Sequence, residues 1–291
     1  VFGQPNCNYY KYTGQLERYE ACLAAEKIAG HYQFSKEFQS ILDSAITLDP
    51  TWDYPYREKS TAYLKSGDFV TWKKLIDKAV KYDTLNNLYY RGRCRLNFFR
   101  DYKGAMEDFK LLERFIHSYN KNEQLLVHDG THVDIYVALC LRHLGQLDAA
   151  INLIRGRIDK NNINPGLADH LYLGAMYLEN GEYTKAIEEF KKQEQIDDLA
   201  ENRFYAAKAY KALQNTEEYL SHLKLSKIYF EQGQRIHDYY VEDFYKIYLQ
   251  EISEEEEEKV PTRQLWIQIL LDGVKTAGIK WLNPTWAADC Q

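Results

Sequence analysis

The chain has 291 residues, 45% hydrophobic and 27% charged, values typical of a soluble protein with a hydrophobic core. Its formal net charge of -6 argues against phosphate-based binding of duplex nucleic acid, because such proteins usually carry a basic excess on the binding domain. No run of about 18 apolar residues occurs in it, so the sequence predicts no membrane span. Only 6 prolines and 15 glycines favour a mostly helical chain, and 25 tyrosines are an unusual number.

Residues 1–19 form an N-terminal segment that includes the start of a first helix. The small residues Val1 and Gly3 fit the end of a signal peptide cut after Gly3, which predicts export to the periplasm; a cytoplasmic location is the alternative. The five cysteines are an odd number without CxxC spacing, so a zinc knuckle is not indicated. Cys7 and Cys22 could pair in an exported protein, and free thiols are the alternative.

Four segments of the chain repeat one pattern. They are SGDFVTWKKLI from Ser66, FRDYKGAMEDF from Phe99, LGQLDAAINLI from Leu144 and NGEYTKAIEEF from Asn180. Each has a turn residue at its second position, followed by large apolar residues at helical spacing and preceded by a small residue. A turn separates two helices, and the small residue lets the second helix approach the first closely. The pattern therefore predicts a series of helix pairs.

Weaker copies of the pattern extend the series in both directions, upstream around Phe38 to Pro50 and downstream around Ala207 to Leu223. The turn residues are 33 to 36 residues apart, except that 45 residues separate Arg100 from Gly145. This difference predicts an insertion near His117 to Gly130.

The stretch YYRGRCRLNFFR, from Tyr89 to Arg100, contains four arginines and could suggest a nucleic-acid surface. On a helix, however, one stripe holds the apolar and small residues Leu85, Leu88, Gly92, Leu96 and Phe99. Arg91 and Arg95 lie on one side of this stripe, and Arg93 and Arg100 lie on the other. Their stems can cover apolar surface while the charged groups stay in water. We therefore expect a repeat helix here and no binding of nucleic acid.

The stretch HDGTHVD, from His128 to Asp134, invites a metal-site interpretation because His128 and His132 are four residues apart. Gly130 interrupts the helical turn that would bring them together, and Thr131 with Asp134 is typical of a helix N-cap and its partner. The sequence contains no Gly-rich phosphate loop and no GxSxG motif. We predict no metal, no cofactor and no enzymatic activity; a metal-dependent hydrolase is the alternative.

The repeat spacing resembles the tetratricopeptide repeat (TPR), a helix-turn-helix unit of about 34 residues. The copy that matches the family pattern most closely contains Gly174, Tyr177, Gly181, Tyr183, Ala186 and Phe190. The second copy has Trp72 where the family has alanine, and Gly92 in the third copy predicts a first helix that is one residue longer. The resemblance covers roughly Glu20 to Glu231. It implies an all-α fold, an α-solenoid in which five to six helix pairs over residues 20–232 form a right-handed superhelix.

Residues 233–291 are predicted to cap the open face of the last pair, because the final repeat of an array needs a cover. Arg235 to Ile252 and Thr262 to Ala277 are the two expected capping helices. Between them, Glu254 to Glu258 are five consecutive like charges, which repel one another and prefer water. We expect a solvated linker there, with an acidic docking tail as the alternative.

In the TPR family the first helix of each repeat lines a concave face that takes extended peptides or partner helices. In four successive repeats of this chain a tyrosine stands two places before the small residue, whereas the second repeat has Glu58. The residues expected on this face are Tyr54, Arg57, Thr61, Tyr90, Arg93, Asn97, Tyr136, Tyr172, Tyr205 and Lys208. The lysine and asparagine clamp with which some members bind chaperone C-termini is not reproduced.

Tyrosine offers a large contact area at a small entropy cost, which suits a binding groove. The alternative is that each ring packs against the neighbouring repeat. The sequence therefore predicts a non-catalytic scaffold whose groove binds a protein or peptide, and self-association is left open. A small-molecule or glycan binder that uses the tyrosine-lined groove is the alternative function.

Overall fold

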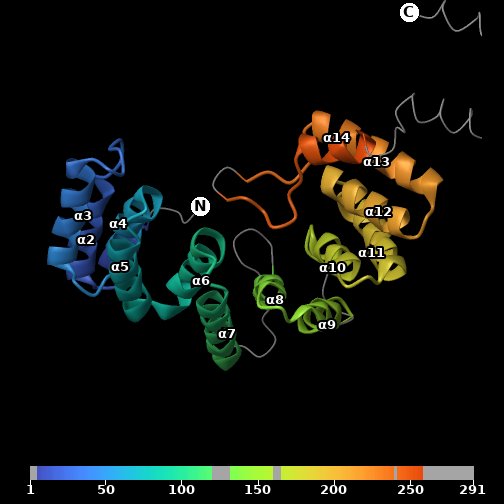
Figure 1. Cartoon of the computed structure of the whole chain (residues 1–291). Coiled ribbons are helices and arrows are strands. Elements are labelled where there is room, and N and C mark those ends of the chain that lie inside the picture. Colours follow the sequence, from blue (N-terminus) through green and yellow to red (C-terminus); the bar gives the residue numbers. More distant parts are fainter. Residues whose placement is uncertain (1–4, 120–131, 160–164, 239–240, 258–291) are drawn as a thin grey trace, which may run out of the picture. The chain divides into compact units, whose positions relative to one another are not determined.

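The structure is a computed structural model that describes residues 5–119, 132–159, 165–238 and 241–257 (Figure 1). Within these ranges the regular elements are helices and no strand is present, which confirms the all-α prediction. None of the described helices is long and apolar enough to cross a bilayer. The chain divides into two compact units. Unit 1 holds Val1–Asp197 and Asp238–Glu242, and unit 2 holds Asp198–His237 and Asp243–Gln291.

Unit 1 is a series of helix pairs in chain order (Figure 1). Its helices are α1 (Cys7–Tyr12), α2 (Leu16–Glu26), α3 (Lys36–Leu48), α4 (Asp53–Ser66), α5 (Phe69–Tyr82), α6 (Thr84–Cys94), the π-helical turn η1 (Arg95–Phe99), α7 (Tyr102–Tyr119), α8 (Val133–His143), α9 (Leu147–Ile158), α10 (Asp169–Glu179) and α11 (Tyr183–Ile196). The first helix of each pair packs on the second, and the second packs on the first helix of the next pair. This arrangement is the predicted α-solenoid.

In its described part, unit 2 contains a sixth pair, α12 (Ala200–Ala212) and α13 (Thr216–Glu231), and then α14 (Leu249–Glu257), which packs on α13. The number of pairs among the described residues agrees with the five to six predicted. The predicted insertion starts at the end of α7 and lies mostly outside the described residues, as does the second expected capping helix, Thr262 to Ala277.

Glycines in the first helix of two pairs set how closely the second helix approaches. A Cβ atom built on Gly174 would lie 2.6 Å from Cε1 of Phe190, and one built on Gly92 would lie 2.7 Å from Cε1 of Phe109. Both phenyl rings are fully buried. Because any side chain at these positions would overlap a ring, the contact between small and large residues is the one that the repeat pattern predicts.

The turn between the two helices of a pair uses the left-handed backbone conformation. The residues at this position and their φ angles are Gly67 (80°), Arg100 (54°), Gly145 (75°), Gly181 (77°) and Gln214 (59°). Glycine adopts this conformation without steric cost, which explains its recurrence in the pattern.

The third pair accommodates its extra residue in the π-helical turn η1, directly before Arg100. A π-helical turn holds one residue more than an α-helical turn, so the predicted longer first helix is present in this form. The same turn carries Phe99, whose ring packs on Trp72 with the ring centroids 4.6 Å apart. Trp72 is buried, although it stands where the family has alanine.

Two of the four arginines in the stretch, Arg91 and Arg95, hold α6 and η1 against α7. Of the predicted stripe, Leu88, Gly92 and Leu96 are buried and Phe99 is half-buried, whereas Leu85 at its start is exposed. Arg91 donates to both carboxylate oxygens of Asp108 at 2.9 and 2.6 Å, and Arg95 lies 3.1 Å from the same carboxylate. Asp108 is buried, so these cations have a structural partner.

The segment after α13 differs from its prediction. Arg235 to Ile252 was expected to be one helix, yet residues 235–238 and 241–248 are not helical and α14 begins only at Leu249. Acidic side chains accept the backbone N–H groups that a helix would use internally. Glu201 accepts from Ile236 at 3.0 Å, Asp238 from Val241 at 3.1 Å and Asp243 from Tyr245 at 2.8 Å.

The prediction of a solvated linker at Glu254 to Glu258 is wrong for the part that the structure describes. Glu254 to Glu257 belong to α14, and Glu255 and Glu256 are paired with lysines of α12 and α13. The positive charges of these lysines offset the mutual repulsion on which the linker prediction was based.

Candidate functional site

The predicted binding face begins on α4 and α6, where four of its residues make direct contacts. The Arg57 guanidinium lies 5.6 Å from the ring centroid of Tyr54. The Thr61 hydroxyl lies 3.2 Å from the hydroxyl of Tyr90, so a hydrogen bond joins the two helices. Burial raises the pKa of Tyr54 to about 12 and also raises that of Tyr90, so both hydroxyls remain protonated donors at neutral pH.

The face continues from α6 to α8. The Arg93 guanidinium lies 5.9 Å from the ring centroid of Tyr89 and 5.8 Å from that of Tyr136. The Tyr136 ring stacks on Phe109 at 5.4 Å. Arg93 retains 30% of its side-chain exposure, and its Nη2 lies 3.9 Å from a carboxylate oxygen of Asp238 in the same unit. Arg93 is thus a cation that an acidic group can reach.

Of the other predicted residues in unit 1, Asn97 lies in η1 and Tyr172 in α10, and both are half-buried. Glu58, which interrupts the tyrosine series, lies 3.6 Å from Arg57. Burial raises the pKa of Glu58, and the Arg57 charge opposes that shift. The surface therefore combines hydroxyl donors with two arginines and one acid.

Tyr89 also contacts two residues of this face, Arg93 and Tyr136, although the sequence analysis did not select it. Its hydroxyl lies 3.4 Å from that of Tyr136, 47 residues further along the chain. The repeat pattern selects Tyr90, the next residue, so Tyr89 could be identified only from its contact with another helix. We name the connected set of Tyr54, Arg57, Thr61, Tyr90, Arg93 and Tyr136 the tyrosine–arginine row.

In unit 2 the two predicted residues lie on α12. The half-buried Tyr205 ring meets Tyr245 edge to face with the centroids 5.8 Å apart. Lys208 is exposed, and its Nζ lies 3.8 Å from Glu255 of α14. Lys211, one turn further along α12, forms a closer ion pair with Glu255 at 2.7 Å. Lys211 could not have been selected from the sequence, because its partner is 44 residues away.

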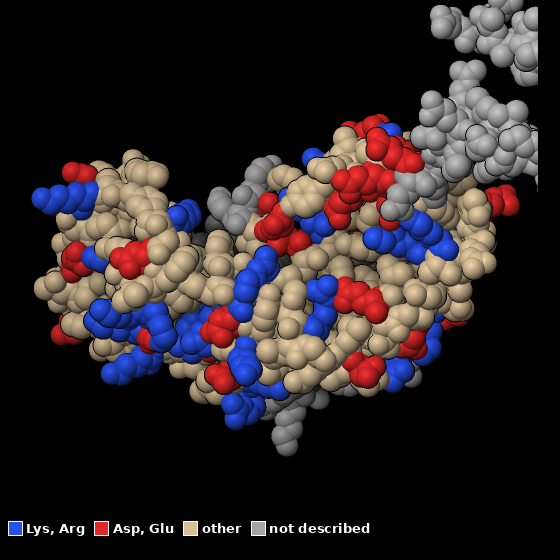
Figure 2. Space-filling view, viewed as in Figure 1, with Lys and Arg blue, Asp and Glu red and all other residues tan. Residues whose placement is uncertain are grey.

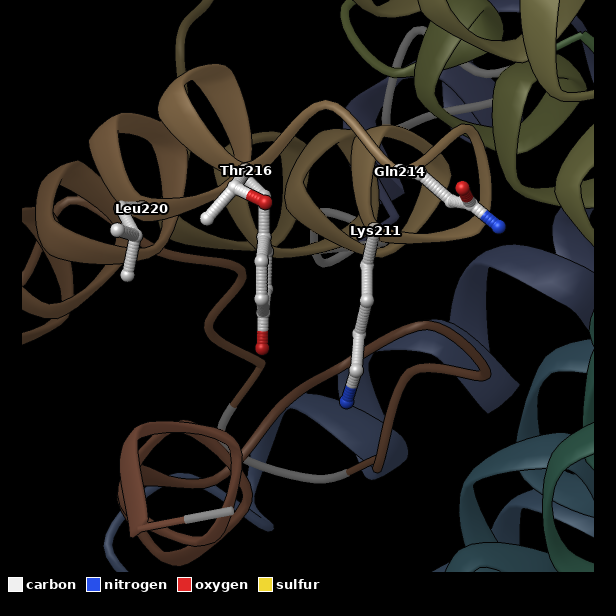
Figure 3. Close-up of a pocket in the computed structure, with 5 residues that line it drawn as sticks. Lys211, Gln214, Thr216 and Leu220 are labelled. Carbon is white, nitrogen blue, oxygen red and sulfur yellow. The ribbon is translucent and has the colours of Figure 1, made fainter. Parts of the chain in front are cut away.

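An open pocket of about 420 Å³ lies beside this ion pair, at the turn between α12 and α13 (Figure 3). Its lining combines a cation, polar groups and an exposed leucine: Lys211, Gln214, Thr216, Tyr219 and Leu220. Two of the lining residues also contact α14, because the Tyr219 hydroxyl donates to Oε2 of Glu255 at 2.8 Å and Lys211 pairs with the same carboxylate.

No group of three metal-ligating side chains is present in the part of the chain that the structure describes. His132 caps α8, because its Nδ1 accepts the backbone N–H of Asp134 at 3.1 Å. The helix N-cap is therefore His132 and not Thr131 as predicted. His128 and Asp129, the other members of the proposed metal motif, lie outside the described residues.

No protein-family model and no curated protein sequence matches this chain. Among solved structures, PilW, described as a type IV pilus biogenesis factor, is similar with a TM-score of 0.55 and 14% identity over 75% of this chain and 94% of that chain. PilF of Pseudomonas aeruginosa has a TM-score of 0.52 and 12% identity over 76% and 95%. YrrB, described as a TPR protein with an unusual peptide-binding site, has a TM-score of 0.45 and 17% identity over 64% and 90%.

Proposed function

We propose that this chain, whose fold is that of a tetratricopeptide-repeat protein, is a non-catalytic scaffold that binds an extended peptide along the tyrosine–arginine row of unit 1. The observation that carries the proposal is the continuity of the row. The Thr61–Tyr90 contact connects α4 to α6, and the Arg93–Tyr136 contact connects α6 to α8. Arg57 and Tyr54 lie together on α4, at the start of the row. A ligand lying across these helices would meet a similar set of groups at each step.

The chemistry of the row suits a peptide. Protonated hydroxyls of tyrosine and threonine can donate to the carbonyl groups of an extended chain. The half-buried Arg93 lies 3.9 Å from the carboxylate of Asp238, which supports an acidic side chain of the peptide as its ligand.

The same geometry disfavours the glycan alternative. A sugar stacks on an open aromatic face, yet the Tyr54 ring stacks on Trp52 at 5.1 Å and the Tyr136 ring stacks on Phe109 at 5.4 Å. Both tyrosines are only 8% exposed. Neither ring has an open face on which a sugar could stack. Their packing agrees with the alternative that each ring packs against a neighbouring repeat.

The test is a peptide array probed with the labelled protein, followed by anisotropy titration of the peptides it retains. We expect Arg93→Glu to weaken binding at least tenfold, because the cation of the row is reversed. Arg155→Glu, an exposed reversal on α9, is the matched control and should bind as the unchanged protein does. Equal affinities for both variants would refute the row as the binding site.

A titration of intrinsic fluorescence with an oligosaccharide panel distinguishes the two functions. A saturable response to a sugar, without any retained peptide, would favour the glycan alternative. Light scattering on the same protein samples addresses the predicted self-association, because a second copy bound to the row would double the mass in the unchanged protein but not in Arg93→Glu.

We also propose that the protein works in an oxidising compartment, which the predicted export would provide. Cys7 and Cys22 form a disulfide with their Cα atoms 5.4 Å apart. Such bonds persist mainly outside reducing cytosol. Thiol titration of protein purified under native conditions should leave Cys7 and Cys22 unmodified, and alkylation of both without a reductant would contradict the proposal.

A further inference from the structure

α14, the last helix that the structure describes, pairs with lysines of α12 and α13. Glu255 of α14 accepts from Lys211 at 2.7 Å and from the Tyr219 hydroxyl at 2.8 Å. The adjacent Glu256 accepts from Lys227 of α13 at 2.7 Å. Figure 2 shows the acidic side chains gathered over α14 on the visible face of this unit.

α14 is a weak helix by itself. It has nine residues, and isolated helices of this length are unstable in water. Its last four residues are glutamates, whose charges repel one another and oppose the negative end of the helix dipole. Ile252 is its one buried residue among those described. α14 therefore depends on the lysines beneath it, through exposed ion pairs that contribute on the order of 1 kcal/mol or less each.

The ion pairs of α14 with both α12 and α13 indicate that a ligand of these lysines would be helical. Glu255 and Glu256 are adjacent, yet one pairs with Lys211 on α12 and the other with Lys227 on α13. In an extended strand adjacent side chains point to opposite sides, so both could not reach one surface. In a helix they are about 100° apart, and both can.

We infer that Lys211, Lys227 and the Tyr219 hydroxyl, with Lys208 at the edge, form a binding surface for an acidic helix of a partner protein, and that α14 occupies this surface as an internal competitor. The pocket of about 420 Å³ that Lys211 and Tyr219 line also has exposed Leu220 in its lining, so the partner helix would add an apolar side chain that α14 does not supply. This surface is separate in sequence from the tyrosine–arginine row, and the inference does not depend on the peptide function proposed for the row.

A tethered competitor reduces the apparent affinity of a free ligand, because the ligand must first displace it. Neutralising the two anchoring glutamates should therefore open the surface without changing it. Reversing the lysines should remove the surface itself. These opposite expectations separate a masked binding surface from a helix that merely completes the fold.

The experiment measures anisotropy of a labelled peptide with the sequence LQEISEEEE, added to the full chain at low salt. We expect the double variant Glu255→Gln/Glu256→Gln to bind at least tenfold more tightly than the unchanged chain. Adding Lys211→Glu and Lys227→Glu to that variant should abolish binding. Lys224→Glu, an exposed reversal on the same helix α13, is the matched control and should change affinity less than twofold.

Hydrogen exchange supplies a second measurement that does not rely on the variants. Saturating peptide should speed amide exchange in α14 of the unchanged chain while protecting none of α2 to α11. Equal peptide affinity for the unchanged and neutralised chains would overturn the inference. So would binding that survives the lysine reversals but is lost in Arg93→Glu, which would assign the peptide to the tyrosine–arginine row.

Discussion

Gly174 is the residue at which helix approach depends on the absence of a single carbon atom. A Cβ there would lie 2.6 Å from Phe190, whose ring is fully buried and cannot withdraw without moving its helix. We expect Gly174→Ala to lower the unfolding free energy by about 1–3 kcal/mol, as overpacking of a core usually does. Urea denaturation followed by circular dichroism measures this.

Gly156→Ala is the control for that substitution. Gly156 is also inside a helix, α9, but a Cβ there has no heavy atom within 4 Å. Alanine should raise stability by about 0.5–1 kcal/mol, since it has the higher helix propensity. If both substitutions shifted stability in the same direction, the close packing at Gly174 would not be what limits that position.

Glu201 gives the protein a specific dependence on pH. Burial raises its pKa to about 6 from an ordinary 4.5, and the Ile236 N–H opposes this shift. Because the folded state holds the proton more tightly, this group's contribution to stability is full below pH 4.5 and is lost as the pH rises through 6. The lost contribution is about 2 kcal/mol for a shift of this size.

Glu201→Gln removes that titration while keeping an oxygen that can accept from Ile236. The variant should gain stability relative to the unchanged chain by about 1–2 kcal/mol between pH 5 and pH 7.5. The measurement is the difference between the two urea midpoints at each pH, in which the other titrating groups cancel. A difference that stays constant with pH would contradict a raised pKa for Glu201.

At the scale of elements, α1 is held in place by a covalent bond. It has six residues, too few to be stable by itself, and the disulfide joins Cys7 at its start to Cys22 of α2. Closing a loop of 15 residues contributes about 3 kcal/mol in the loop-entropy treatment. Reduction should therefore lower stability by about 2–3 kcal/mol.

Denaturation with and without dithiothreitol measures this contribution. The double variant Cys7→Ser/Cys22→Ser is the control, because its stability should be low under both conditions and insensitive to the reductant. If dithiothreitol also lowered the stability of the double variant, the effect would not come from the disulfide. Cys94 and Cys140 are buried free thiols and form no second disulfide that reduction could break.

The helix pairs could be predicted from the sequence because their determinants are local. A turn residue with positive φ, a small residue and a large one recur at fixed distances, and Gly181, Gly174 and Phe190 lie within 17 residues of one another. The segment after α13 could not be predicted in this way. Its backbone N–H groups donate to carboxylates that include Glu201, 35 residues upstream. A pattern of helical spacing cannot predict a hydrogen-bond partner at that distance in the sequence.

The candidate sites show the same division. The sequence pattern selected Tyr90 and Tyr136 by their equivalent positions, and both lie on first helices as expected. The pattern could not predict the ion pair between Glu255 and Lys211, because a run of glutamates considered by itself predicts an exposed segment. Tyr89 and Lys211 were missed, and the Glu254 to Glu257 segment was predicted wrongly, because their contacts are with residues far away in the sequence.

For unit 1 as a whole, the contacts run between neighbouring pairs, so destabilisation should spread only to neighbours. α6 and α7 contact α5 and α8, whereas α2 and α3 lie more than one contact away. Gly92→Ala, which would bring a Cβ within 2.7 Å of Phe109, should speed amide exchange about tenfold or more in α5 to α8. Exchange in α2 and α3 should stay unchanged, and Gly156→Ala should speed none of these helices. A uniform acceleration from α2 to α11 would instead mean that the pairs open together, and stability could then not be divided into a sum over repeats and their interfaces.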